Sequence, residues 1–185
     1  MIPALIVGIC WIIFIVVWAV SALSAKRTRQ RSHGLWYVRF IVLVILIVLV
    51  TRTNLLSPRL LWLPPVGLPL QYLGAALCVL GIALAIWARF YLGRNWGMPQ
   101  SVKENPELVT TGPYAFIRHP IYTGMLFAMA GSTLAIGLWW LIVLVAGGAY
   151  FIVSAHAEER LMQETFPDHY PEYKRRTWAL IPFIY

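Results

Sequence analysis

Long apolar stretches separated by short polar ones dominate the chain. The first stretch, 2–23, contains no charged residue, and two more follow at about 35–50 and 70–92. A last stretch runs over 121–156, which is 36 residues without a charge. Because a helix needs about 20 apolar residues to cross a bilayer, the pattern predicts several membrane-spanning helices, and the last stretch is too long for one.

Gly137, which is followed by Trp139 and Trp140, divides this last stretch. Glycine favours a turn between helices, and tryptophan is enriched at membrane interfaces. We therefore predict two spans, at about 121–136 and 138–156, that form a hairpin. A single tilted or re-entrant helix over the whole stretch is the alternative.

The sequence thus predicts an all-α integral membrane protein with five transmembrane helices in a single membrane domain, 1–185. The composition agrees, because 60% of the residues are hydrophobic and only 12% are charged, whereas soluble domains have about 25% charged residues. Small residues at 21–25 resemble a signal-peptide cleavage site. The positive charges follow the first apolar stretch instead of preceding it, however, which favours a first span.

The charge distribution predicts the orientation. Five spans place segments 24–39, 89–120 and 156–185 on one side, with 13 of the 15 Lys and Arg residues and all seven acidic ones. The other side has only Arg52 and Arg59. The positive-inside rule then predicts an outside N-terminus and a cytoplasmic C-terminus. Attraction to the anionic leaflet also explains the net charge of +8, so we expect no nucleic-acid partner.

Two polar segments share the predicted cytoplasmic side, and in the first, 93–124, a turn precedes Tyr114, Arg118, His119 and Pro120. Tyr114 and Arg118 share a face if this piece is helical. Pro120 suits the first turn of a helix, which places His119 at the N-cap, where backbone N–H groups can receive a carboxylate. The simpler interpretation is that Arg118 and His119 only anchor the helix at the interface.

In the second segment, 156–183, Glu158 and Glu159 directly follow a long apolar helix. Adjacent carboxylates at the C-terminal end of a helix oppose both its dipole and the anionic leaflet. They need a cationic partner, and the candidates are Arg118, Arg160, Arg176 or a bound ammonium group. A solvated helix end is the alternative.

One small molecule matches both segments. It has a carboxylate for the helix start, an ammonium for Glu158, and a sulfonium for an aromatic wall of Tyr114, Tyr122 or a nearby Trp. S-adenosylmethionine carries all three groups. The residues therefore favour S-adenosylmethionine as cofactor.

At these residues the sequence resembles the isoprenylcysteine carboxyl methyltransferase and phospholipid methyltransferase family of integral membrane enzymes. The shared pattern covers about 95–183 and reads Leu108-Val109-x-x-Gly112-x-Tyr114-x-x-x-Arg118-His119-Pro120-x-Tyr122-x-Gly124, then Glu158-Glu159-x-Leu161, Phe166, Tyr170-x-x-Tyr173-x-x-Arg176 and Ile181-Pro182. The resemblance implies a pocket for S-adenosylmethionine near the cytoplasmic face, lined by Gln100, Pro106, Glu107, Leu108, Val109, Tyr114, His119, Pro120, Ile121, Tyr122 and Glu158.

Two positions differ from family members that act on prenylated proteins. Pro106 stands where those members often have a polar residue, and Ser154 where they have a basic one. The resemblance therefore extends to the cofactor site more firmly than to the methyl acceptor.

We therefore expect methyl transfer from S-adenosylmethionine, with S-adenosylhomocysteine as product, to a lipophilic or lipidated acceptor that enters from the bilayer. The expected acceptor group is a carboxylate, as in isoprenylcysteine carboxyl methylation, with Arg118 and Arg176 as candidates to steer it. A phospholipid amine is the alternative. A small transporter or channel subunit would need polar residues at the span centres, which are almost purely apolar. The scattered histidines and two cysteines predict no metal site.

Overall fold

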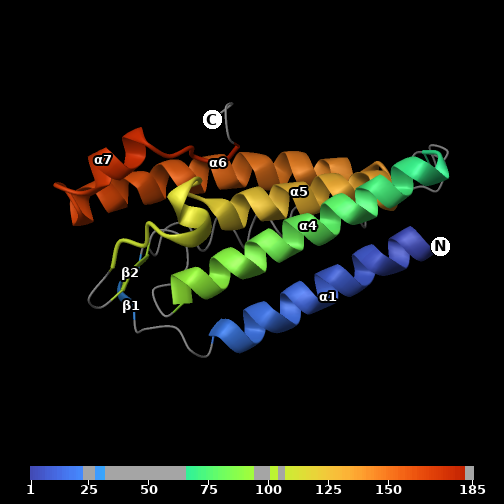
Figure 1. Cartoon of the computed structure of the whole chain (residues 1–185), viewed down its shortest axis with the longest axis horizontal. Helices are drawn as coiled ribbons and strands as arrows, with labels where there is room; N and C mark the ends of the chain where they lie inside the picture. Colours follow the sequence, from blue (N-terminus) through green and yellow to red (C-terminus); the bar gives the residue numbers. More distant parts are fainter. Residues whose placement is uncertain (23–27, 32–65, 94–100, 104–106, 182–185) are drawn as a thin grey trace.

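The computed structural model describes residues 1–22, 28–31, 66–93, 101–103 and 107–181. Almost all of these residues are helical or in short connections between helices (Figure 1). The elements are α1 (Ile2–Ala22), β1 (Thr28–Arg31), α4 (Leu68–Leu92), β2 (Ser101–Lys103), the 3-10 turn η2 (Gly112–Ala115), α5 (Pro120–Ala135), α6 (Trp139–Thr165) and α7 (Tyr170–Arg175).

The two short strands correct the prediction of a purely helical chain. β1 and β2 pair in an antiparallel manner, with Thr28 opposite Lys103. Both lie in polar segments between apolar helices, where extended backbones satisfy one another's hydrogen-bonding groups. Hydrophobic periodicity gave no signal for so short a pairing.

Among the described residues, three helices, α1, α4 and α6, are long and apolar enough to cross a membrane, with 20, 25 and 27 residues in the spans. The chain is thus a multi-pass integral membrane protein. α5 has 16 residues, about 24 Å of helix, which is shorter than a hydrocarbon core of about 30 Å. The second predicted span, 35–50, lies outside the described residues. Five spans and the orientation stay predictions.

The hairpin break lies where the sequence places it. α5 ends at Ala135 and α6 begins at Trp139. Gly137 lies between them with a φ of 157°, a value that other residues rarely adopt. One continuous helix over the stretch is therefore excluded.

The end of α6 differs from the prediction. The helix continues past 156 to Thr165, so Glu158 and Glu159 lie within it and not at its C-terminus. The polar residues that follow are mostly strong helix formers such as Ala, Glu, Arg and Leu. Apolarity marks where a helix leaves the membrane, and not where it ends.

Small residues bring α4 and α5 into close contact. A Cβ atom on Gly81 would lie 2.4 Å from the carbonyl oxygen of Gly124, and one on Gly74 would lie 2.6 Å from that of Gly131. The two helices run in opposite directions (Figure 1). Such close backbone approach is typical of helix packing in lipid. It places the C-terminal end of α4 beside the start of α5.

α1 packs against the same pair of helices. Cys10 lies with Cys78 in the buried core, where both thiols are free and serve as packing groups. Trp11 Nε1 donates a hydrogen bond to Ser132 Oγ of α5 at 3.0 Å. Arg89, near the end of α4, donates to the carbonyl oxygen of Ser21 at 2.7 Å. This bond ties the end of α1 to the end of α4.

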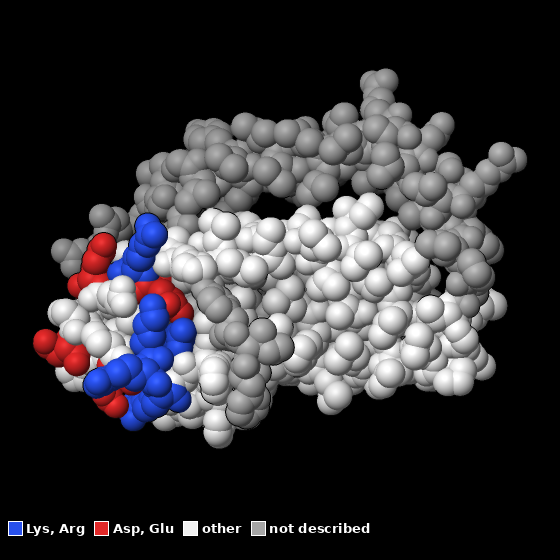
Figure 2. Space-filling model, turned by 90° about the horizontal axis from the view of Figure 1, so that it is seen from above, with Lys and Arg blue, Asp and Glu red and all other residues white. Residues whose placement is uncertain are grey.

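The polar groups of the described residues gather at one end of the bundle. Figure 2 shows Lys, Arg, Asp and Glu side chains together at that end, while the rest of the described surface in this view has none. α7, η2 and the start of α5 lie there as well (Figure 1). The candidate site is therefore at this end.

Candidate functional site

The C-terminal segment lies against the start of α5. The backbone N–H groups of Arg118 and His119 donate to the carbonyl oxygens of Trp178 and Ala179 at 2.8 and 3.1 Å. Thr123 Oγ1 donates to the Leu180 carbonyl at 2.5 Å. The structure thus brings together the two polar segments that are separate in the sequence.

Tyr114 lies in η2 beneath this junction. Its side chain is buried, and burial raises the pKa of the Tyr114 hydroxyl above its ordinary value. Its carbonyl oxygen accepts a hydrogen bond from Tyr173 Oη at 2.8 Å. The condition under which Tyr114 and Arg118 would share a helical face is not met, because η2 ends at Ala115 and Ile117 pairs with Trp178 of the C-terminal segment.

His119 is the N-cap of α5, and Pro120 is its first helical residue, as predicted. The imidazole lies between two carboxylates, with Nδ1 3.4 Å from Glu158 Oε2 and Nε2 3.7 Å from Glu159 Oε1. Burial alone would lower the pKa of His119, but the interactions with Glu158 and Glu159 outweigh it and raise the pKa. The geometry therefore favours a cationic His119.

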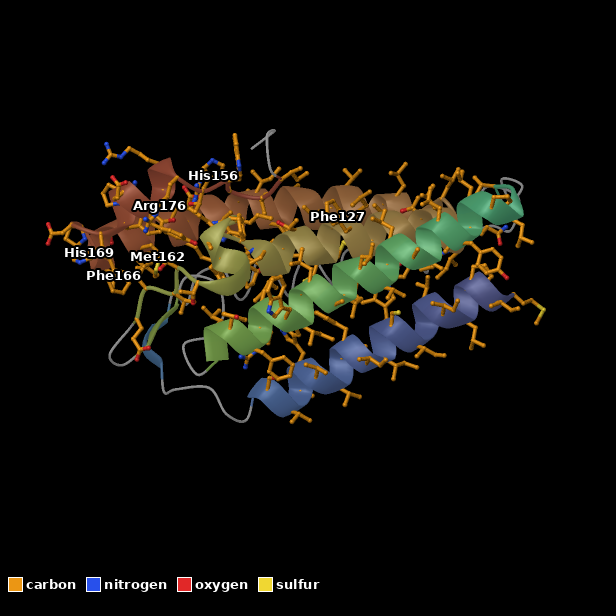
Figure 3. All side chains as sticks on the ribbon, viewed as in Figure 1. Phe127, His156, Met162, Phe166, His169 and Arg176 are labelled. Atoms are coloured by element: carbon orange, nitrogen blue, oxygen red, sulfur yellow. The ribbon has the colours of Figure 1, made fainter. Side chains whose placement is uncertain are left out.

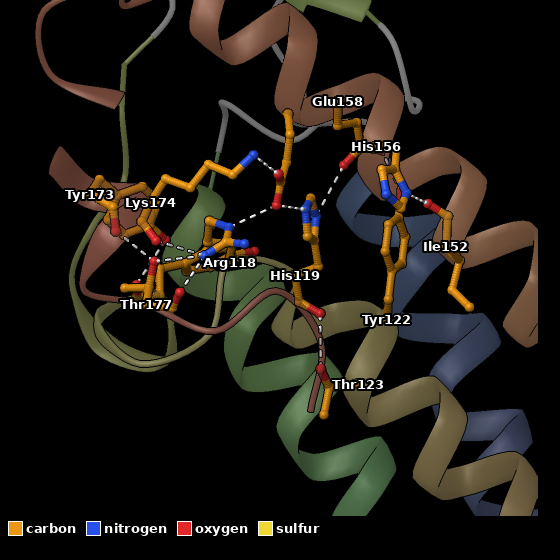
Figure 4. A network of polar contacts seen from close by, with 12 residues as sticks. Arg118, His119, Tyr122, Thr123, Ile152, His156, Glu158, Tyr173, Lys174 and Thr177 are labelled. Atoms are coloured by element: carbon orange, nitrogen blue, oxygen red, sulfur yellow. Dashed lines mark hydrogen bonds and ion pairs between the residues drawn. The ribbon is translucent and has the colours of Figure 1, made fainter. Parts of the chain in front are cut away.

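Glu159 is the centre of an ion-pair network (Figure 4). Its Oε1 accepts from Arg118 Nε and its Oε2 from Lys174 Nζ, each at 2.7 Å. Arg118 Nη1 also donates to the carbonyl oxygens of Lys174, at 3.1 Å, and Thr177. One buried carboxylate thus joins the start of α5, α6 and α7.

Glu158 has different partners and more exposure. It accepts a hydrogen bond from Tyr122 Oη and lies beside His119. Its side chain is 24% exposed, compared with 10% for Glu159. Two protein donors therefore orient the Glu158 carboxylate while part of it stays accessible.

An aromatic row leads away from Glu158. The rings of His119 and Tyr122 stack at 5.6 Å between centroids, and those of Tyr122 and Phe151 at 4.7 Å. Their planes differ by only 8° and 11°. This row is an aromatic wall of the kind predicted for Tyr114 or Tyr122, but Phe151 was not foreseen because its position in an apolar helix gave no signal.

The remaining predicted residues are spread more widely. Arg176 is exposed at the polar end of the molecule (Figure 3). Arg160 is exposed, and Glu107 is also exposed. Leu108, Val109 and Ile121 are half-buried. Gln100 and Pro106 lie outside the described residues.

Sequence reasoning missed Lys174, Thr177 and Arg89. Lys174 and Thr177 contribute through the fold of the C-terminal segment. The ammonium of Lys174 pairs with Glu159, and the carbonyl oxygens of both residues accept hydrogen bonds from Arg118. No spacing in the sequence indicates this. Arg89 did carry a signal, since the sequence places an arginine at the end of an apolar span, where a charged group needs polar partners. The structure shows that its side chain is buried.

Comparisons with known proteins show which family the chain resembles. The family model described as phospholipid methyltransferase matches residues 70–169. A nickel-cobalt-cadmium resistance protein from Alcaligenes xylosoxydans xylosoxydans is 31% identical over 89% of this chain and 70% of its own length. A protein-S-isoprenylcysteine O-methyltransferase from Tribolium castaneum is 29% identical over 62% of this chain. The match spans only 42% of that relative.

A solved structure shares the fold. It is a eukaryotic intramembrane Ras methyltransferase, an isoprenylcysteine carboxyl methyltransferase, with a TM-score of 0.56 and 24% sequence identity. The likeness covers 83% of this chain and 55% of that one. The family model covers more than half of the present chain, including α4, η2, α5 and α6. The chain therefore belongs to the phospholipid methyltransferase family.

Proposed function

We propose that this protein transfers a methyl group from S-adenosylmethionine to a lipophilic acceptor that reaches the site from the bilayer. The observation that carries the proposal is the setting of Glu158. Its carboxylate is oriented by Tyr122 and His119 and remains partly exposed, at the polar end of a bundle of apolar helices. Membership of a methyltransferase family supports the same conclusion.

The donor set fits the charged groups of this cofactor. Glu158 is suited to its ammonium, and the first turn of α5 to its carboxylate. The faces of Tyr122 and Phe151 suit a sulfonium, because aromatic faces attract cations. The cofactor pocket is proposed to include Gln100, Pro106, Glu107, Leu108, Val109, Tyr114, His119, Pro120, Ile121, Tyr122 and Glu158.

When bound, the cofactor supplies an electrophilic methyl group together with its leaving group. The residues of the chain then bind the cofactor and the acceptor, orient them toward each other and exclude water from the site. An acceptor carboxylate is already ionised near neutral pH and needs no general base. Arg176 is the better candidate to steer it, because it is exposed, whereas Arg118 Nε and Nη1 already bind protein acceptors.

The state of His119 favours a carboxylate over an amine acceptor. An amine must lose a proton before it attacks, so a neutral base would be required. His119 lies between Glu158 and Glu159, and the interactions with these carboxylates raise its pKa and so disfavour the neutral imidazole. His119 is therefore less suited to act as this base. The proposed topology, with five spans and a cytoplasmic site, places the polar end of the bundle on the side of the membrane where the soluble cofactor is.

A radiolabel experiment tests the proposal. Membranes that contain the protein are incubated with S-adenosylmethionine carrying a tritiated methyl group, and lipids and proteins are then separated. We expect label in a lipophilic product that mild alkali releases as methanol, as a methyl ester requires. Membranes with Glu158→Ala should lose this signal. Base-stable label in phospholipid would instead identify an amine acceptor, and no label above that of membranes lacking the protein would contradict the proposal.

A further inference from the structure

Arg118, Glu159 and Lys174 form a closed ring of contacts (Figure 4). Arg118 Nε binds Glu159 Oε1, and Lys174 Nζ binds Glu159 Oε2, both at 2.7 Å. The carbonyl oxygen of Lys174 then accepts from Arg118 Nη1 at 3.1 Å, which closes the ring. Lys174 thus contributes with both its side chain and its backbone. The ring fixes α7 against α6 and the start of α5.

The ring leaves one nitrogen of the guanidinium for another partner. Arg118 Nε and Nη1 bind Glu159, Lys174 and Thr177, but within the described part of the chain Nη2 makes no hydrogen bond. The guanidinium is planar and rigid, so fixing two of its nitrogens also fixes the third. The side chain is only 9% exposed. A donor fixed in such a place binds an oxyanion more strongly than one in water.

The charges of the cluster also favour a further anion. Arg118 and Lys174 are cationic, and the interactions of His119 with Glu158 and Glu159 raise its pKa, which favours a third cation beside only two carboxylates. If Glu158 binds an ammonium group, Glu159 is the carboxylate that remains to balance these cationic groups. An added carboxylate would reduce this excess positive charge.

We propose that Glu159 and Lys174 are positioning residues, which hold Arg118 so that Nη2 receives the carboxylate of the cofactor's amino-acid part. This inference rests on the proposed function. The ammonium and carboxylate of that amino-acid part share one carbon atom. Glu158 and Glu159 are consecutive in α6 and both lie beside His119. Glu158 and Arg118, which Glu159 binds, can therefore hold the ammonium and the carboxylate of one amino-acid part.

Two ligands test the inference in calorimetric titrations of the full chain in detergent. S-adenosylhomocysteine carries the amino-acid part, whereas 5′-methylthioadenosine has the nucleoside and thioether without it. Glu159→Gln keeps an acceptor oxygen but removes the charge. We expect this variant to bind S-adenosylhomocysteine about tenfold more weakly, the scale of one misplaced charge-assisted hydrogen bond. Its affinity for methylthioadenosine should be unchanged.

Lys174 provides the second variant, because its half-exposed side chain tolerates substitution better. Lys174→Met should lower the affinity for S-adenosylhomocysteine but not the affinity for methylthioadenosine. Lys174→Arg keeps the positive charge and should bind S-adenosylhomocysteine as the unaltered protein does. Glu164→Gln, at an exposed position of the same helix, is the control and should change neither ligand.

A purely structural role would lower thermal stability without changing the ratio of the two affinities. An unchanged ratio in both Glu159→Gln and Lys174→Met would overturn the inference. If the unaltered protein did not bind S-adenosylhomocysteine at all, the proposed function itself would fail, and the positioning role would fail with it.

Discussion

Glu158 and Glu159 are consecutive residues of α6, yet they bind different partners. Glu159 pairs with Arg118 and Lys174, whereas Glu158 accepts from Tyr122 and keeps more exposure. Neighbouring residues on a helix point about 100° apart, so one can face the fold while the next faces a ligand. We therefore propose that Glu159 stabilises the site and that Glu158 is available for binding.

The first prediction concerns the stability of this network. Glu159→Ala removes the carboxylate and leaves Arg118 buried without its anion. Removing one partner of a buried ion pair costs about 3 kcal/mol or more of unfolding free energy. Unfolding in detergent, followed by circular dichroism, measures this loss. The exposed Glu164→Ala should have almost no effect, and equal stability of the two variants would argue against the network.

The second prediction concerns the contact between α4 and α5. A Cβ atom on Gly81 would lie 2.4 Å from the Gly124 carbonyl oxygen, so Gly81→Ala must push the helices apart. We expect a loss of about 1–3 kcal/mol in stability, the usual cost of overpacking. Gly8→Ala in α1 is the matched control, because no atom lies within 4 Å of the new Cβ. If Gly81→Ala were as stable as Gly8→Ala, the close approach would be wrong.

The third prediction concerns the C-terminal segment. Tyr173→Phe removes the hydrogen bond to the carbonyl oxygen of Tyr114 and leaves that buried oxygen without this donor. The expected cost is about 1–2 kcal/mol. Thermal unfolding in detergent measures it. Tyr170→Phe serves as the control, since its hydroxyl makes no hydrogen bond within the part of the chain that the structure describes. An equal loss of stability in Tyr173→Phe and Tyr170→Phe would contradict the hydrogen bond from Tyr173 to the Tyr114 carbonyl oxygen.

The fourth prediction concerns pH. The pKa of His119 in the folded protein is raised above its ordinary value of 6.5. The stabilisation that protonated His119 gives the folded protein is therefore complete below pH 6.5. It is lost as the pH rises through the raised pKa of His119 in the folded state. The melting temperature should fall over this range. His119→Gln should be less stable at low pH, with a flatter profile, because glutamine does not titrate. Parallel profiles for the two proteins would rule out His119 as the titrating group.

The sequence predicted the parts of the fold that depend on local chemistry. Gly137 marks the hairpin break and Pro120 the start of α5, because each residue type has a strong backbone preference. The length of α6 was missed, since helix-forming polar residues after Glu158 extend a helix beyond its apolar part.

The sequence indicated several residues of the polar cluster but not how they pair. Arg118, His119 and the two glutamates were all recognised as candidates. Which glutamate Arg118 binds depends on the rotation of α6 and on the path of the C-terminal segment. The contributions of Lys174 and Thr177 come from that same path. Such tertiary contacts leave no periodic signal in one sequence.

The most direct test is a calorimetric titration of S-adenosylhomocysteine into the purified protein and its Glu158→Ala variant in detergent. We expect the unaltered protein to bind this ligand and the variant to bind it at least about tenfold more weakly, as the loss of a charge-assisted contact requires. The melting temperature should change little, because Glu158 is the more exposed glutamate. Equal affinity in the two proteins would contradict the assignment of Glu158 to the cofactor site.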